Sequence, residues 1–220
     1  MSGFHMLTLS IAEGIPGSAK FEINCIHIAR DWKGKMVSFE KTKQEIFTPD
    51  GKPIWDLGRI TLVENFHRKP DAKRNRIYNT AGEIKLLENK VVTKETLKRV
   101  LEENLVPYSA FVEDNTLHYA VVKPRGVISI DQDTSGEKKY RKQRMIVDFD
   151  DNHRQEKMLN KDYRWVHYWR QIPDDVIYTK QDMYEKLFND PGKTLYLIIR
   201  KYYFDNQPFP RCWISGMHWL

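Results

Sequence analysis

Cysteine is scarce in this sequence, which contains only Cys25 and Cys212 among 220 residues. Two cysteines so far apart in the chain provide neither a disulfide framework nor the paired spacing of a zinc ribbon. Cys25 and His27 could form half of a metal site, but no second pair of cysteines or histidines follows at ligand spacing. We therefore expect no metal and no cofactor.

Long apolar runs are also absent. No stretch approaches the roughly 20 apolar residues that cross a bilayer. After Met6, where we expect the native chain to start, no basic segment is followed by the apolar core of a secretion signal. The sequence thus predicts a cytoplasmic protein without a membrane partner.

Signatures of the common enzyme classes are missing as well. The chain has no G-x-S-x-G elbow, no glycine-rich phosphate loop and no H-E-x-x-H helix. His118, His153, His167 and His218 have no nucleophile beside them in the sequence, which favours structural or surface roles. These absences favour a protein that is not an enzyme, although they do not exclude catalysis.

Positive charge is present in excess and is clustered. Lysine and arginine total 36 against 30 acidic residues, a net charge of +6. The runs "RKPDAKRNR" (68–76) and "KKYRKQR" (138–144) hold much of that excess, which is typical of a polyanion partner, although basic loops can also be merely solubilising. The candidate nucleic-acid-binding residues in these runs are Arg68, Lys73, Arg74, Arg76, Lys138, Lys139, Arg141, Lys142 and Arg144.

Strand patterns dominate the chain. "KFEINCIHIAR" (20–30) alternates apolar and polar residues, and several other segments are rich in β-branched and aromatic residues between turn sequences such as "NDPGK". Two segments have helical spacing instead: 93–105, with Thr93 as the N-cap, and 179–190, with Thr179 as the N-cap. Short strands of this kind favour barrels or sandwiches.

The order of these elements suggests two similar units, residues 6–112 and 113–220. About five strands and one helix in roughly 100 residues is the content of an OB-fold, a small Greek-key barrel that binds oligonucleotides. We predict a mainly β (α+β) protein of two OB-like barrels, each with one accompanying helix. A pair of SH3-like barrels or one continuous sandwich would produce nearly the same pattern.

One family resemblance supports this interpretation. The segment "LYLIIRKYYFDNQPFPRCWISGMHWL" (195–220) resembles the end of the dual OB-containing domain family, and "IWDLGRITLVENFHRKPDAKRNRIYN" (54–79) is similar to that family's middle strand and polar segment. The start of the chain departs from the family, because it lacks a Gly-Gly-Arg-Cys-like element and a Trp-Ile-Arg-Pro motif. The resemblance implies two OB-folds and nucleic-acid binding, often beside prokaryotic anti-phage systems.

The stretch "RWVHYWRQ" (164–171) raises a separate question, because it packs three aromatic residues among cations. If it is a strand, Trp165 and Trp169 share one face, which we assign to the core. Arg164, Tyr168 and Arg170 then form the other face, where Arg125 from the turn "KPRG" would join them in a surface that stacks on bases and contacts phosphates.

An enzymatic alternative comes from Pro70-Asp71 followed by Glu83-Ile84-Lys85. This spacing occurs in metal-dependent nucleases of the PD-(D/E)xK type, in which two carboxylates bind Mg²⁺ and the lysine positions the attacking water. The motif is short, however, and "YNTAGEIK" is also typical of a hairpin with Gly82 at the turn.

Taken together, these patterns predict a non-catalytic protein that binds DNA or RNA through its basic loops and an aromatic–arginine strand face. Two alternatives stay open: a Mg²⁺-dependent nuclease that uses Asp71, Glu83 and Lys85, and a subunit that contacts other proteins of a nucleic-acid-processing complex.

Overall fold

The computed structural model describes residues 3–14, 19–28, 36–69, 77–133, 135–138, 141–149, 154–204, 207 and 209–220. The chain divides into two compact units: Met1–Asn104 with Tyr203–Pro208, and Leu105–Tyr202 with Phe209–Leu220. The sequence placed the division later, between residues 112 and 113. No helix in the described part of the chain is long and apolar enough to span a membrane.

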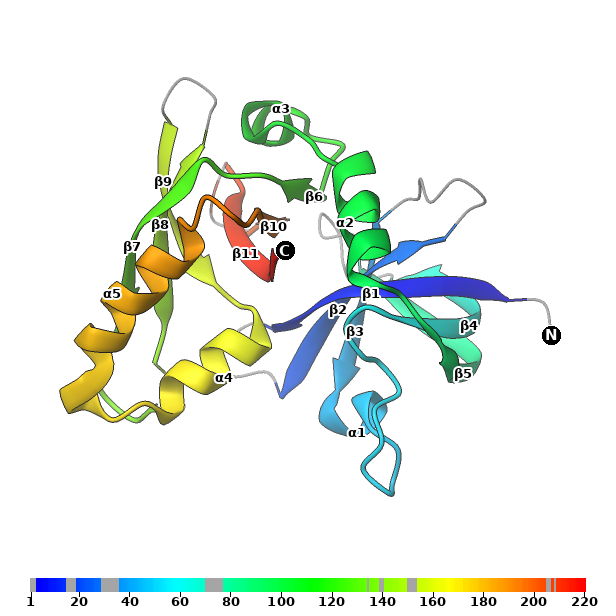
Figure 1. Ribbon diagram of the computed structural model, residues 1–220. Helices are drawn as coiled ribbons and strands as arrows, with labels where there is room; N and C mark the ends of the chain where they lie inside the picture. Colours follow the sequence, from blue (N-terminus) through cyan, green and yellow to red (C-terminus); the bar gives the residue numbers. More distant parts are fainter. Residues whose placement is uncertain are drawn as a thin grey trace. The chain divides into compact units, whose positions relative to one another are not determined.

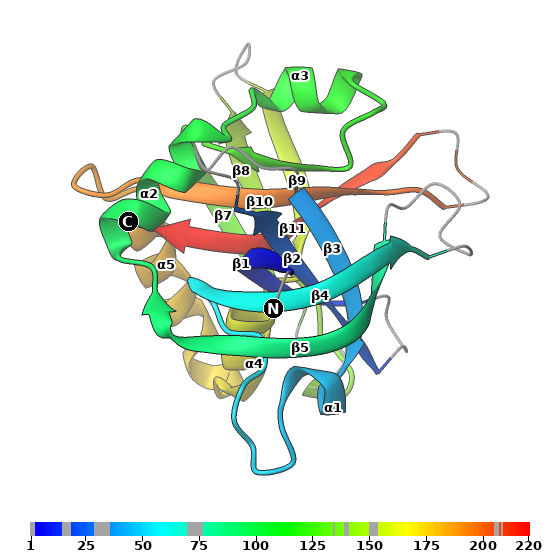
Figure 2. The same cartoon turned by 90° about the vertical axis from the view of Figure 1, so that its right-hand side faces the viewer.

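The first unit is a closed barrel with the strand order β1-β2-β3-β5-β4. β3 and β5 pair in parallel, while the other neighbours, including β1 and β4, are antiparallel. This arrangement is the Greek-key topology of an OB-fold, and Figure 2 shows β4 and β5 running side by side. The strands are β1 (Phe4–Glu13), β2 (Lys20–His27), β3 (Met36–Thr42), β4 (Arg59–Arg68) and β5 (Ile77–Val91).

Alternation along the strands fills this barrel. Ile23 and Cys25 of β2 and Phe39 of β3 are fully buried in one cluster with Trp55. The intervening residues Glu22, Asn24 and Ile26 are buried too, so β2 lacks the exposed face that its alternating pattern suggests. Burial also raises the pKa of the Cys25 thiol, so this cysteine is a core residue rather than a reactive one. Two helices belong to this unit, α1 (Lys43–Ile46) and α2 (Lys94–Glu103).

The second unit contains one six-stranded sheet with the order β6-β10-β11-β9-β8-β7. Its last five strands, in the order β7-β8-β9-β11-β10, repeat the arrangement of the barrel, with β9 and β11 parallel where β3 and β5 are parallel. The strands are β6 (Tyr119–Val122), β7 (Gly126–Gln132), β8 (Gln143–Phe149), β9 (Arg154–Asn160), β10 (Leu195–Tyr202) and β11 (Arg211–Trp219). The prediction of a mainly β protein with two OB-like units is confirmed. The first unit forms a closed barrel, as predicted, whereas the strands of the second form a sheet with ends at β6 and β7.

The two sheets differ in closure. β10 pairs with β6, whereas the equivalent strand of the first unit, β4, pairs with β1 and closes the barrel. The second unit also has more helices than the single one expected. They are α3 (Tyr108–Glu113), α4 (Tyr163–Gln171), the short 3-10 helix η2 (Asp174–Val176) and α5 (Ile177–Phe188).

Helix α5 lies along the edge strand β7 (Figure 1). The Glu185 side chain accepts a hydrogen bond from the Ile130 N–H at 2.7 Å. Asn189 accepts one from the Val127 N–H at 2.9 Å and donates one to the Val127 carbonyl at 2.7 Å. Side chains thus bind backbone groups of β7 that would otherwise form an open sheet edge.

We expect Asn189→Ala to lower the free energy of unfolding by about 1–3 kcal/mol, because the N–H and the carbonyl of Val127 would both lose their hydrogen bonds to the Asn189 side chain. Urea unfolding measures the loss, and amide exchange at Val127 should accelerate in the variant. Lys186→Ala is the control, because Lys186 is exposed on the same helix. Equal stability of the two variants would show that α5 does not protect this edge.

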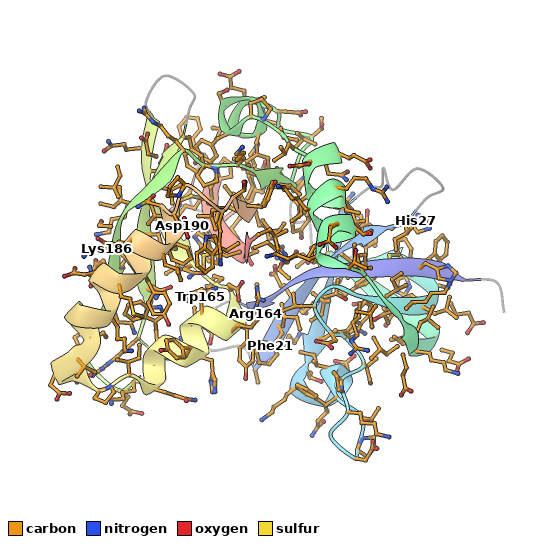
Figure 3. The ribbon with its side chains drawn as sticks, in the orientation of Figure 1. Phe21, His27, Arg164, Trp165, Lys186 and Asp190 are labelled. Atoms are coloured by element: carbon orange, nitrogen blue, oxygen red, sulfur yellow. The ribbon has the colours of Figure 1, made fainter. Side chains whose placement is uncertain are left out.

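The segment "RWVHYWRQ" is helical, so its assignment to a strand was wrong. It forms most of α4, and the carboxylate of Asp162 accepts a hydrogen bond from the Arg164 N–H at the N-cap. Val166 and Trp169 are buried at helical spacing. Trp165 extends from α4 toward α5 and contacts Phe188, with ring centroids 5.1 Å apart (Figure 3). The core assignment of Trp169 is confirmed, and Trp165 is partly buried against the same core.

Three other local predictions have mixed outcomes. Thr93 caps α2 as predicted, because its hydroxyl accepts a hydrogen bond from the Thr96 N–H. Helix α5 begins at Ile177, so Thr179 lies inside it and is not its N-cap. Gly82 does not form a hairpin turn but lies within β5 with a φ of 75°, beside a shift in the register with β4.

Candidate nucleic-acid interface

In chain order, both basic runs fall at connections between strands, with Arg68 at the end of β4 and Arg144 within β8. The run 68–76 spans the β4–β5 connection of the first unit, and the run 138–144 begins in the β7–β8 connection of the second. In an OB-fold the ligand surface comprises strands 2 and 3 with the loops between strands 1 and 2 and between strands 4 and 5. By strand order, the β4–β5 and β7–β8 connections correspond to these two loop positions, and the role of the two runs in binding stays a prediction. Asp71, Lys73, Arg74, Arg76 and Lys139 lie outside the described residues.

Strands β8 and β9 of the second unit present a surface that we call the outer face. Met145, Val147 and Phe149 of β8 point into the core, so the alternate residues of β8 point away from it. Antiparallel pairing sets Ile146 against Lys157 and Arg144 against Leu159. The outer face comprises Ile128, Arg144, Ile146, Lys157 and Leu159.

This surface combines aliphatic side chains with cations. Ile128 is 45% exposed. The Lys157 ammonium lies 3.3 Å from the Asp131 carboxylate, and both side chains are about half exposed. Lys138 and Lys142, which precede β8 in the basic run, are exposed as well. Arg125 lies at the other end of β8, where its Nε is 4.0 Å from the Asp148 carboxylate.

Lys157 was missed because "RQEKMLN" (154–160) looks like a polar connection between strands. Alternation gives no clear signal here, because the apolar residues Met158 and Leu159 are adjacent in the sequence. Only its pairing with β8 shows that Lys157 lies beside Ile146.

Arg141 differs from the other cations of its run, because it is buried. Its guanidinium donates two hydrogen bonds to the carboxylate of Asp174, one of them at 3.1 Å. Arg170 in turn donates to the Arg141 carbonyl at 3.1 and 3.2 Å. These bonds join the β7–β8 loop to α4 and η2, so Arg141 and Arg170 have structural contacts here.

The Arg141–Asp174 pair should make stability depend on pH. The hydrogen bond from Arg141 holds the pKa of Asp174 below its ordinary value. A carboxyl whose pKa is lower in the folded state stabilises the fold above its unfolded-state pKa, about 3.9, and loses that contribution as the pH falls through the folded-state pKa. We therefore expect the gap in unfolding free energy between wild type and Asp174→Asn to narrow below about pH 4. Urea unfolding at several pH values measures this gap, and a gap independent of pH would contradict the assignment.

Arg164 and Tyr168 share a surface of α4 rather than a strand. The Arg164 guanidinium donates to the Asp162 carboxylate at 3.0 Å and to the Met217 carbonyl at 2.9 Å. Tyr168 is 41% exposed, and its ring centroid lies 6.0 Å from that of Tyr184. Burial, followed by the hydrogen bond and charge of Tyr168, raises the pKa of Tyr184 to about 12. Arg164 and Tyr168 therefore lie on a helix and not on the strand face that alternation suggested. Their role in binding stays a prediction.

In the first unit, Glu40 anchors the start of the β4–β5 loop. Its carboxylate accepts hydrogen bonds from Lys69 at 2.6 Å and from Lys20 at 2.9 Å. Burial alone would raise the pKa of Glu40, but the bonds and charges of Lys69 and Lys20 hold it below its ordinary value. Arg68 is exposed at the end of β4, immediately before this anchor.

The nuclease residues are only partly described. Glu83 and Lys85 both lie in β5 and are exposed, while Asp71 lies outside the described residues. The Glu83 N–H donates to the Glu64 carboxylate at 2.8 Å. Within the described ranges, no group of three or more histidine, cysteine or acidic residues has a metal-binding arrangement. The nuclease stays a hypothesis, because Asp71 is not among the residues described.

Comparison with known proteins found similar solved structures but no similar family model or curated protein. No protein-family model matches the chain, and no curated protein does either. A replication protein A heterotrimer bound to single-stranded DNA aligns with 100% of this chain at 9% identity and a TM-score of 0.42. The alignment spans 49% of the length of the matched replication protein A chain. A deletion mutant of the single-stranded DNA-binding protein from Thermus aquaticus aligns with 98% of this chain, over 91% of its own length, at 11% identity and a TM-score of 0.24. The OB-fold assignment rests on the strand order of the two sheets.

Proposed function

We propose that this protein binds nucleic acid without cleaving it. The contacts are made by the outer face of the second unit and by the basic loops of both OB-like units. The proposal is supported by the chain positions of two basic runs that lie far apart in the sequence. They fall at the β4–β5 and β7–β8 connections, which correspond by strand order to loops that an OB-fold uses for oligonucleotides.

The outer face favours a single strand over a duplex. Ile128, Ile146 and Leu159 offer an apolar surface on which unpaired bases and sugars can pack, while Arg144 and Lys157 stand beside it to contact phosphates. In a duplex the bases are stacked on each other and their apolar faces are covered. The apolar side chains of the outer face cannot form hydrogen bonds that distinguish one base from another, so we expect weak sequence preference.

Narrower forms of the proposal follow from the family resemblance and from the open alternatives. The similarity of residues 54–79 and 195–220 to the dual OB-containing domain family would place the protein beside a prokaryotic anti-phage system. Other protein subunits could share the nucleic acid with it. A cytoplasmic location would suit each of these roles.

An electrophoretic binding assay tests the proposal directly. The full chain is mixed with single-stranded and double-stranded DNA and RNA of equal length, with and without Mg²⁺. We expect retarded single strands that remain intact in both conditions. Cleavage that requires Mg²⁺ would favour the nuclease, and the absence of any retarded species would contradict nucleic-acid binding.

A further inference from the structure

The first unit contains a large pocket that the proposed nucleic-acid surface does not use. It has a volume of about 920 Å³ and lies between the segment from Thr48 to Arg59 and the second half of β5, from Ile84 to Lys90. Binding pockets for small ligands or peptide side chains commonly reach roughly 300–1,000 Å³. The basic loop of this unit spans residues 69–76, at the other end of β5 from Lys90.

An irregularity in the β4–β5 pairing shapes this pocket. Thr61 pairs with Leu86, but Arg59, two residues earlier on β4, pairs with Val91, five residues later on β5. The register therefore skips residues 87–90, and β5 bulges where the pocket forms. The Arg59 guanidinium donates to the Glu88 carbonyl at 3.4 Å, inside this bulge.

The lining has an aliphatic part and a charged part. Its apolar residues are half-buried rather than packed away, and none is aromatic. They are Pro53, Ile54, Ile84, Leu86 and Leu87. Four cations and two acids complete the charged part of the lining, which leaves a net charge of +2. They are Lys52, Arg59, Lys85, Lys90, Asp56 and Glu88.

Not all of these charges are available to a ligand. Arg59 pairs with Asp56 at 3.1 Å, and Lys52 with Asp50 at 3.4 Å. Lys85 and Lys90 are exposed and form no ion pair with any residue in the described ranges. The charge of Lys90 also contributes, after burial, to the lowered pKa of His5. Two ammonium groups without an ion-pair partner among the described residues thus lie beside the aliphatic part of the lining.

We propose that this pocket binds a short segment of a partner protein that carries aliphatic and acidic side chains. An aliphatic side chain of the segment fills the space over Ile54 and Leu87, and its carboxylates pair with Lys85 and Lys90. The protein would then hold a partner on one surface and a nucleic acid on another.

Selection from a phage library of random peptides of about 12 residues tests this site, since peptides of that length span a groove of this size. Peptides selected on the full chain should be enriched in aspartate or glutamate beside leucine, isoleucine or valine. The double variant Lys85→Glu/Lys90→Glu should bind them about tenfold or more weakly, because like charges would then oppose each other. Leu87→Ser should also weaken binding, since it removes part of the aliphatic lining without touching the core.

The matched control is Lys94→Glu/Lys98→Glu, the same charge change on the exposed surface of α2. It should bind the selected peptides like wild type. The proposal is overturned if no acidic–aliphatic peptides are enriched or if both double variants bind them equally. It is also overturned if a single-stranded oligonucleotide displaces them competitively, because the pocket would then belong to the nucleic-acid surface. Nucleic-acid affinity of the two double variants should be equal, so the two proposals fail separately.

Discussion

Replacing Lys142, Arg144 and Lys157 with glutamine should weaken single-strand binding by about a hundredfold near 0.1 M salt. Each phosphate contact to a single strand contributes a slope of roughly 0.7 in the logarithm of affinity against the logarithm of salt concentration. Losing three contacts should therefore flatten the slope by about 2 units, which corresponds to the hundredfold loss at that salt concentration. A fluorescence titration at several salt concentrations measures both quantities.

The control variant replaces Lys94, Lys98 and Arg99 with glutamine. These residues are exposed on α2 of the first unit, and replacing them removes the same net charge. We expect a much smaller change in slope for this variant. If the two triple variants lose affinity equally, the protein binds through its net charge alone, and the outer face is not a site.

Trp169→Ala should lower the free energy of unfolding by about 3–5 kcal/mol, as large truncations in a core do. Trp169 is 1% exposed in the core of the second unit, and its ring centroid lies 5.6 Å from that of Tyr184. Removing the indole would leave a cavity between α4 and α5. Urea unfolding of the full chain measures the loss.

The neighbouring variant Tyr168→Ala is the natural comparison, because Tyr168 is 41% exposed on the same helix. It should retain most of the stability of the wild type. If Tyr168 also stacks on a base, the variant should lose about 1–3 kcal/mol of single-strand affinity while it stays folded. If Tyr168→Ala destabilises the protein as much as Trp169→Ala, the assignment of Tyr168 to the surface and of Trp169 to the core is wrong.

Much of the fold could be predicted because its signals are local. The alternation of Ile23 and Cys25 follows from the pleat of a single strand, and the Thr93 cap depends only on an amide three residues away. The segment 164–171 misled for the same reason. Its aromatic and β-branched residues favour a strand, yet Val166 and Trp169 are also spaced for one face of a helix, and packing in the second unit decides between the two.

The basic runs illustrate the limit of such local reasoning. Their charge could be read from residues 68–76 and 138–144, but not that Arg141 is buried against Asp174, 33 residues away, while Lys142 is exposed. Burial and ion pairing depend on which segments meet, and a charge pattern contains no information on that. The same holds for Lys157, whose neighbour Ile146 comes from another strand.

By itself, the sequence determined the β-rich composition, the alternation of the strands, the helix cap at Thr93 and the clustering of positive charge, because each depends on residues close together in the chain. The tertiary structure alone decided that β3 and β5, and likewise β9 and β11, pair in parallel. Those pairings join distant segments, so no local pattern contains them. Tertiary packing also decided that Arg141 is buried while its neighbour Lys142 is exposed, since burial follows from contacts between distant residues rather than from the order of residues.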